Sequence, residues 1–295
     1  MTDKNAPRPI FPSLQALCAV NTAQPWCIDL IQPELSGGRT IASDLDAIAA
    51  RPDATALRVS GLDQKTFELL VTRYGSQFDA ICFWKSGRIV DLTPLEALPQ
   101  LRLVAFYRNQ RTARLWDLRR NARLVGLQFE NFTRLHALDD LERGGTLQEL
   151  NFGDALWNTP VFNSLSPLAK LVSLRRLSFN ARRISDCRIQ PLASLPQLES
   201  LAFPPNLFTT SQVAWLRAHL PESVQSHVLG PLFRLGPIRN VSDNTVTELD
   251  KNVLVVGKRK PALNSRRDDA RIQRYVEEFA TLVQKFRDDS SAQPD

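Results

Sequence analysis

Long apolar runs are missing from this sequence, because no stretch approaches the roughly 20 residues needed to cross a bilayer. The first residues, MTDKNAPRPIFPSLQALCAV, do not combine a basic leader, an apolar core and a small-residue cleavage site. We therefore expect no membrane insertion and a cytoplasmic location.

Cysteine is scarce, and the four residues Cys18, Cys27, Cys82 and Cys187 show no CxxC spacing. Neither a disulfide scaffold nor a zinc site is indicated, and a reducing compartment fits best. The three histidines have no HExxH spacing, and no GxxxxGK[ST] phosphate loop is present. A nucleophilic Cys82 would need a neighbouring base, and none can be assigned. We therefore expect no metal, no cofactor and no enzymatic activity.

Lysine is scarce as well, since the net charge of +6 is carried by 29 Arg and 8 Lys. This Arg excess fits a GC-rich coding sequence better than a binding preference. The apolar content of 43% and charged content of 23% are those of a globular protein. A chain of 295 residues can bury a substantial core, as one large domain or two ordinary ones.

One pattern of apolar residues is abundant. LTPLEALPQLRLVAF (92–106), LSPLAKLVSLRRLSF (165–179) and IQPLASLPQLESLAF (189–203) place apolar residues at positions 0, 3, 6, 9, 12 and 14. The same template fits from Leu115 and Leu138, and weaker copies begin at Leu45 and Leu69. Successive copies start 24, 23, 23, 23, 27 and 24 residues apart. Such a nearly fixed period is typical of a solenoid of stacked repeats.

The segment LxxLxxLxxLxxLxF resembles the leucine-rich repeat (LRR) family, of the type with repeats of about 22–24 residues, over residues 45–208. The resemblance implies one short parallel strand and one helical or 3₁₀ return segment in each repeat. The expected fold is therefore an α/β curved solenoid of about seven repeats, with the strands on its concave face. Phe occupies the last core position in six of seven copies, so we expect a spine of stacked rings.

The sequence departs from the family in two ways. The asparagine that usually follows the strand survives only as Asn109 and Asn206, and the other slots hold Leu62, Ser86, Phe132, Ala155 and Arg182. The segment GDALWNTPVFNSL contains four extra residues, which we expect to bulge after the fifth strand.

The segments outside the repeats suggest a division of the chain. We expect an N-terminal capping segment (1–44), the repeat array with a terminal capping helix (45–224), a C-terminal appendage of strands and a helix (225–290) and a disordered tail (291–295). Residues 268–287 form the clearest helix, with an apolar stripe from Ile272 to Phe286. We expect the stripe to pack on the chain's own strands near 228–235 and 252–256. Presentation to a partner or to a second copy is the alternative.

Strand residues that alternate with the core positions must face outward, which in this family means the concave face. Trp84 and Tyr107 occupy equivalent positions in neighbouring repeats, so the two rings should lie side by side. Exposed adjacent aromatic residues often dominate the energetics of an interface. The alternative is that the N-terminal segment covers them. The expected partner-binding residues are Trp84, Tyr107, Leu103, Glu130, Arg58, Gln128, Asn151 and Asn180, with Trp157 and Phe162 next in line.

The function expected from this pattern is non-catalytic recognition of another protein through the concave face, by a monomer. The family supports adaptor, regulatory-subunit, inhibitor and effector roles, and the sequence does not choose among them. The alternative is a nucleic-acid-binding protein that uses Arg-rich edges of the solenoid. Interleaved acidic residues weaken this basic stripe, so we do not expect nucleic acid as the partner. The arginines concerned are Arg102, Arg108, Arg111, Arg114, Arg119, Arg120 and Arg123, and then Arg175, Arg176, Arg182, Arg183 and Arg188.

Overall fold

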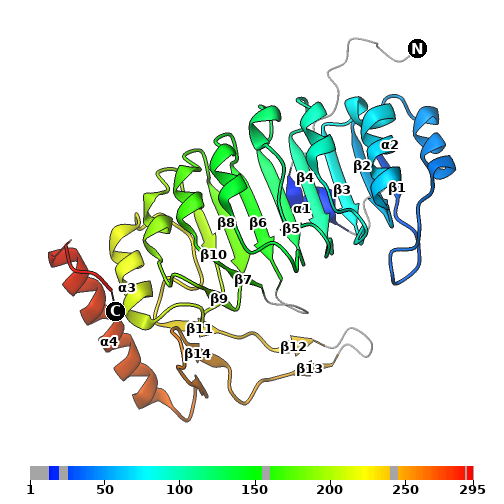
Figure 1. The fold of residues 1–295 in the computed structure, drawn as a ribbon. Helices are drawn as coiled ribbons and strands as arrows, with labels where there is room; N and C mark the ends of the chain where they lie inside the picture. The colour runs from blue at the N-terminus through cyan, green and yellow to red at the C-terminus, as the bar shows by residue number, and fades with distance from the viewer. Residues whose placement is uncertain (1–12, 20–25, 155–159, 240–244, 290, 295) are drawn as a thin grey trace, which may run out of the picture.

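A parallel sheet of eight strands extends through most of the chain (Figure 1). The computed structural model describes residues 13–19, 26–154, 160–239, 245–289 and 291–294. The strand order β1-β2-β3-β4-β5-β6-β8-β10 follows the order of the sequence, as in a solenoid. The expected curved α/β solenoid is therefore confirmed. The strands are β1 (Cys27–Leu30), β2 (Ala56–Ser60), β3 (Ala80–Trp84), β4 (Leu103–Tyr107), β5 (Gly126–Glu130), β6 (Glu149–Gly153), β8 (Arg176–Asn180) and β10 (Ser200–Ala202).

The register of the sheet aligns the Phe position of one repeat with that of the next. Ring centroids lie 4.6 Å apart in Phe83–Phe106, 5.4 Å in Phe129–Phe152 and 5.2 Å in Phe152–Phe179. Phe132, which occupies an asparagine slot, packs edge-on against Phe106 at 5.7 Å and Phe129 at 5.6 Å. The expected Phe spine is therefore present, and Phe132 extends it.

Most return segments are 3₁₀ helices, as expected where leucines recur at every third residue. Proline occupies the first turn of three of them, where its missing N–H costs no hydrogen bond. The second return is instead a full α-helix, capped by the Asp63 carboxylate, which accepts from the Thr66 N–H at 3.0 Å. The returns are η1 (Ala42–Ala50), α2 (Gln64–Tyr74), η2 (Gly75–Gln77), η3 (Thr93–Ala97), η4 (Leu118–Arg120), η5 (Asp139–Arg143), η6 (Ser166–Lys170) and η7 (Gln190–Ser194).

Asn121 occupies a leucine position of the template and is completely buried. Its Nδ2 donates to the carbonyl oxygens of Leu95 at 2.9 Å and Leu98 at 2.7 Å, and its Oδ1 accepts from Trp116 Nε1. The Asn121 amide thus satisfies two backbone carbonyl groups of the preceding coil. It takes over part of the role of the asparagines that are missing from the slots after the strands.

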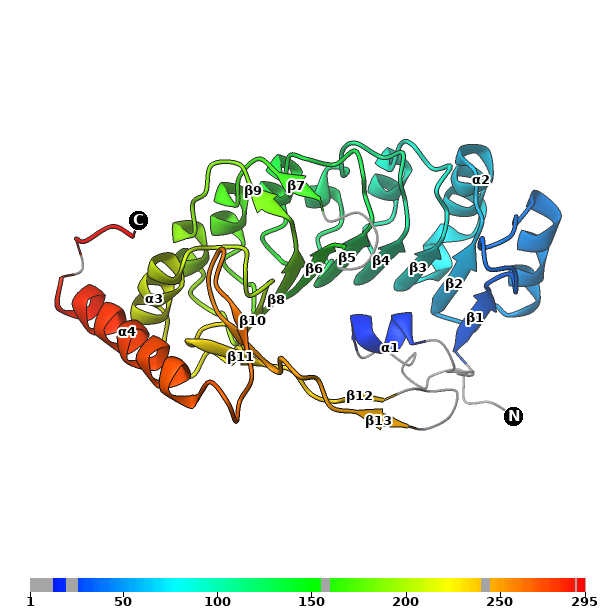
Figure 2. The same cartoon turned by 90° about the horizontal axis from the view of Figure 1, so that it is seen from below.

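The N-terminal segment contributes to both the sheet and its concave side. β1 pairs with β2 and adds a strand before the first repeat. Figure 2 shows helix α1 (Leu14–Cys18) on the face of the sheet opposite α2 and the 3₁₀ segments. The Ser13 side chain caps this helix by accepting from the Ala16 N–H. A second apolar cluster therefore forms on the concave side, from Leu14, Leu17, Cys27, Ala56, Ala80, Cys82, Leu103 and Ala105.

The C-terminal region closes the other end of the solenoid. Helix α3 (Thr210–His219) begins with a capping box between Thr209 and Gln212 and buries Val213 and Leu216. Three short antiparallel strands follow in the order β11-β14-β15, and a separate ribbon pairs β12 with β13. In Figure 2 this ribbon lies on the concave side of the sheet. The strands are β11 (Leu232–Arg234), β12 (Ile238–Arg239), β13 (Val246–Thr247), β14 (Val253–Val255) and β15 (Ala262–Leu263).

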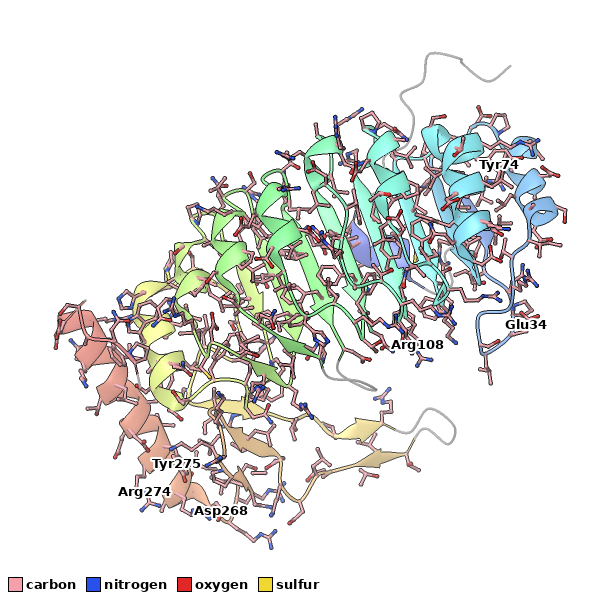
Figure 3. The ribbon with its side chains drawn as sticks, in the orientation of Figure 1. Glu34, Tyr74, Arg108, Asp268, Arg274 and Tyr275 are labelled. Carbon is pink, nitrogen blue, oxygen red and sulfur yellow. The ribbon has the colours of Figure 1, made fainter. Side chains whose placement is uncertain are left out.

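Helix α4 (Asp269–Asp288) packs on its own chain, as expected. Ile272 joins the small cluster of β14 and β15, and Tyr275, labelled in Figure 3, packs against this cluster. Lys260 Nζ lies 5.1 Å from the centroid of the Tyr275 ring. Phe279 and Phe286 are buried in the main core, where α4 contacts α3. The contact with α3 was not expected from the sequence. No helix in the described ranges is both long and apolar enough to span a membrane.

The described residues of the expected disordered tail, 291–294, form two hydrogen bonds with the rest of the chain. The Ala292 carbonyl accepts from Trp215 Nε1 at 3.2 Å, and the Gln293 Oε1 accepts from Gln190 Nε2 at 3.2 Å. The chain end therefore contacts α3 through Trp215 and the last 3₁₀ segment, η7, through Gln190.

Candidate partner-binding surface

Trp84 and Tyr107 end strands β3 and β4 and are direct partners in the sheet register. Their rings stack at 4.1 Å between centroids and 12° between planes, and both side chains are half-buried. Lys85 Nζ lies 5.8 Å from the Trp84 ring centroid, and Arg108 Cζ lies 5.6 Å from that of Tyr107. Figure 3 shows Arg108 at the edge of the solenoid where these strands end. The aromatic pair is thus rigid, partly accessible and flanked by cations.

Glu130 continues this row on β5, opposite Tyr107 in the register. Its Oε1 accepts from Gln128 Nε2 at 2.8 Å. Burial raises the pKa of Glu130, the negative charge of Asp154 raises it further, and the Gln128 hydrogen bond opposes both effects. Glu130 is therefore a half-buried carboxylate with a second carboxylate, Asp154, nearby.

A small pocket of about 170 Å³ opens beside Glu130. Its floor includes Gly153, which has φ +98° and could not carry a Cβ, because that atom would lie 1.8 Å from the Asn180 carbonyl oxygen. The charged groups of the lining are the carboxylates Glu130 and Asp154, and amide and hydroxyl groups supply most of the rest. The pocket suits a cationic or hydrogen-bond-donating group. Its lining is Tyr107, Glu130, Asn151, Phe152, Gly153, Asp154, Ser178 and Asn180.

Three of the expected binding residues are not accessible. Arg58, Leu103 and Gln128 are only 3%, 4% and 9% exposed. Helix α1 and its cluster lie over this part of the concave face, and Arg58 is paired with Asp29 at 2.9 Å. Arg58, Leu103 and Gln128 are therefore buried, whereas Trp84 and Tyr107, the residues to which the covered-face alternative referred, are half-buried. The small side chains at Ala56, Ala80, Cys82 and Ala105 were the signal in the sequence that room exists for a helix.

The remaining expected residues lie on β3 to β6 and on β8, beside the part of the concave face that α1 covers. We call this row the open strip, and it consists of Trp84, Tyr107, Glu130, Asn151 and Asn180, all half-buried. Of the two second-choice residues, Phe162 is 2% exposed on the short strand β7 (Val161–Phe162), where it packs against Phe152 at 5.1 Å. Phe162 is therefore a core residue. Trp157 lies outside the described residues.

The extra residues of the fifth repeat lead into β7, which pairs with β9 (Arg183–Ile184) as a separate two-stranded ribbon. Part of the predicted bulge, 155–159, lies outside the described residues.

Cys82 is 1% exposed beneath α1. Its pKa is raised well above the ordinary range by a hydrogen bond to Cys18 and by burial. Burial likewise raises the pKa of Cys27 to about 11. A nucleophilic cysteine requires the thiolate form, which this environment disfavours. Within the described ranges, no group of three or more His, Cys, Asp or Glu side chains could hold a metal ion.

The Arg-rich edges are interleaved with acidic partners in the structure as in the sequence. Four ion pairs illustrate this: Arg114–Asp140 at 3.1 Å, Arg119–Asp117 at 2.7 Å, Arg175–Glu199 at 3.3 Å and Arg176–Glu149 at 3.0 Å. The hydrogen bond from Arg119 lowers the pKa of Asp117 to about 2, so this carboxylate stays charged at neutral pH. Four of the twelve arginines named for these edges therefore have a carboxylate partner that partly neutralises them.

The stacked parallel strands, the aligned Phe positions and the leucine-lined returns define a leucine-rich-repeat solenoid. No family model matches the sequence, and no curated protein matches it.

Similar solved structures include an LRR protein of Leptospira interrogans, with 18% identity, a TM-score of 0.45, and coverage of 65% of this chain and 47% of that one. Another is the internalin InlF of Listeria monocytogenes, with 16% identity, a TM-score of 0.40, and coverage of 63% and 62%. TLR13 in its complex with ssRNA13 shows 14% identity, a TM-score of 0.41, and coverage of 62% and 30%. The chain thus spans less than two thirds of each of these proteins.

Proposed function

We propose that this protein is a non-catalytic recognition scaffold that binds a partner protein through the open strip of its concave face. The observation that carries the proposal is the stacked Trp84–Tyr107 pair beside a pocket whose lining includes the carboxylates Glu130 and Asp154. Rigid, partly exposed aromatic residues are typical anchors of protein interfaces.

The partner chemistry follows from the pocket. A Lys or Arg side chain of the partner would compensate the charge of Glu130 and approach the π face of Tyr107. Apolar residues next to that side chain would pack against the aromatic pair. The partner segment is therefore expected to combine one basic residue with apolar neighbours.

Expectations from the sequence also concern the oligomeric state, the location and the division of the whole chain. We propose that the protein acts as a monomer in the cytoplasm, as an adaptor, a regulatory subunit, an inhibitor or an effector. The proposed units are the capping segment 1–44, the array 45–224 and the appendage 225–290. The acid-paired arginines favour a protein partner over a nucleic acid.

Affinity capture followed by mass spectrometry would identify the partner, and calorimetry with the purified partner would test the strip. Trp84→Ala and Tyr107→Ala should each weaken binding by at least about 1–2 kcal/mol, because interface anchors do so when truncated. Val172→Ala is the matched control, since Val172 is 56% exposed and lies outside the open strip. Melting curves of all variants would check that the fold is retained.

Unchanged affinity in the Trp84→Ala/Tyr107→Ala double variant would place the site elsewhere. A captured nucleic acid whose affinity falls steeply with salt would instead support the Arg-edge alternative.

A further inference from the structure

Cys18 and Cys82 come together although they are far apart in the sequence. Cys18 ends α1 and is half-buried, and Cys82 lies in the middle of β3 and is 1% exposed. Both side chains belong to the apolar contact between α1 and the concave face, and the Cys18 thiol lies close enough to Cys82 to raise the pKa of Cys82. The residue next to Cys82 in the sheet register is Ala105, whose side chain is small.

Two hydrogen bonds lead from Cys18 to the open strip. Cys18 Sγ donates to Gln128 Oε1 at 3.7 Å, and Gln128 Nε2 donates to Glu130 Oε1 at 2.8 Å. The thiol pair is thus connected through one amide to the carboxylate at the open strip. The other two cysteines do not share this arrangement: Cys27 lies one row away in β1, and Cys187 is exposed on the turn after β9.

We propose that Cys18 and Cys82 form a redox-active pair whose oxidation to a disulfide fastens α1 onto the concave face. The proposal does not depend on the partner-binding function. Both thiols are free in the structure, which is the reduced state of the pair. The oxidant is of the peroxide or small-disulfide class.

Oxidation of the two thiols by hydrogen peroxide takes two steps. The more accessible Cys18 thiolate attacks one peroxide oxygen, which forms Cys18 sulfenic acid and releases hydroxide. Cys82 then reacts as a neutral thiol: its sulfur bonds to the sulfenic sulfur while its proton passes to the sulfenic oxygen, which leaves as water, so that no free Cys82 thiolate is required. The two thiols lose two electrons and two protons in total, and the peroxide is reduced to two waters.

The consequence for the molecule is a closed loop between residues 18 and 82. Such a cross-link restricts the unfolded chain and holds α1 over the covered half of the concave face. It also removes the S–H donor of Cys18, so Gln128 loses one of the groups that orient its amide toward Glu130.

Peroxide treatment of the reduced full-length protein tests the proposal. We expect the intact mass to fall by two hydrogen atoms, and peptide mapping without reductant to find residues 18 and 82 in one cross-linked peptide. The melting temperature should rise by several degrees on oxidation and return on reduction. Oxidised glutathione should give the same cross-linked peptide.

The Cys18→Ser variant should lose both the cross-link and the rise in melting temperature, whereas Cys187→Ser and Cys27→Ser should keep them. The wild-type peptide map and Cys18→Ser still decide the question if Cys82→Ser does not fold. Two free thiols after treatment, a cross-link through Cys27 or Cys187, or overoxidation of Cys18 without a cross-link would each overturn the proposal.

Discussion

At Glu130 the concave face keeps a carboxyl group that binds its proton more tightly in the folded protein than in the unfolded chain. Its raised pKa is caused first by burial and then by Asp154. Stability from this group is fully present below the ordinary pKa of 4.5 and is lost as the pH rises through the raised value. At neutral pH the ionised Glu130 therefore lowers the stability of the fold.

Glu130→Gln should raise the melting temperature at pH 7, because the substitution removes this charge and keeps an acceptor for Gln128. The gain should shrink as the pH falls toward 4.5, where Glu130 itself becomes protonated. The same variant should bind the proposed partner more weakly. Melting curves across this pH range test the effect, with the exposed Glu142→Gln as the control. Identical pH profiles for the two variants would contradict it.

Individual residues also show how far the sequence predicts the site. The contact between Trp84 and Tyr107 could be predicted, because equivalent positions in stacked repeats must be neighbours. The burial of Arg58 and Gln128 could not be predicted, because it depends on the non-repeated N-terminal segment: Asp29 of β1 pairs with Arg58, and Cys18 of α1 bonds to Gln128. The hydrogen bonds of the buried Asn121 could not be predicted from the sequence either, because its partners are backbone carbonyls of the preceding coil.

Among the elements, the repeat strands were predictable and the returns less so. Each strand repeats one apolar pattern, whereas the form of a return depends on local capping and on proline. The copy from Leu69 fits the template weakly because its return is the α-helix α2, whose period is 3.6 residues rather than three. Helix α4 was predicted within one residue at each end from its apolar stripe, but its packing on α3 is a tertiary contact that no local pattern encodes.

Ending the chain at Arg266 removes α4 and tests its role as a cover. The truncation should lower the melting temperature or the solubility, because Val253, Leu263 and α3 would lose the apolar side chains packed on them. Burial of the Phe279 side chain stabilises the fold by roughly 1.5–3 kcal/mol, and burial of Phe286 does so by a similar amount. Calorimetry and analytical ultracentrifugation provide the measurements. A truncated protein with an unchanged melting curve, together with an associated full-length protein, would instead assign α4 to self-association.

At the scale of the whole molecule, helix α1 covers one part of the concave face and leaves another part accessible. Helix α1 covers the small-residue half over β3 to β5, and the open strip is left beside it. Without α1, the residues Ala80, Cys82, Leu103 and Ala105 would form a continuous apolar patch. Monomeric proteins rarely expose large patches of this kind. The helix therefore determines which part of the concave face is buried and which part stays accessible.

The double variant Leu14→Asp/Leu17→Asp should release α1, because both leucines are buried and a carboxylate cannot be accommodated there. The repeats should stay folded on their Phe spine, while the exposed patch binds a hydrophobic dye and promotes association. Light scattering and dye fluorescence measure these effects. Val246→Asp is the control, since Val246 is 55% exposed on β13 and should change neither. A double variant that stays monomeric, binds no dye and melts like the wild type would show that α1 does not cover the concave face in solution.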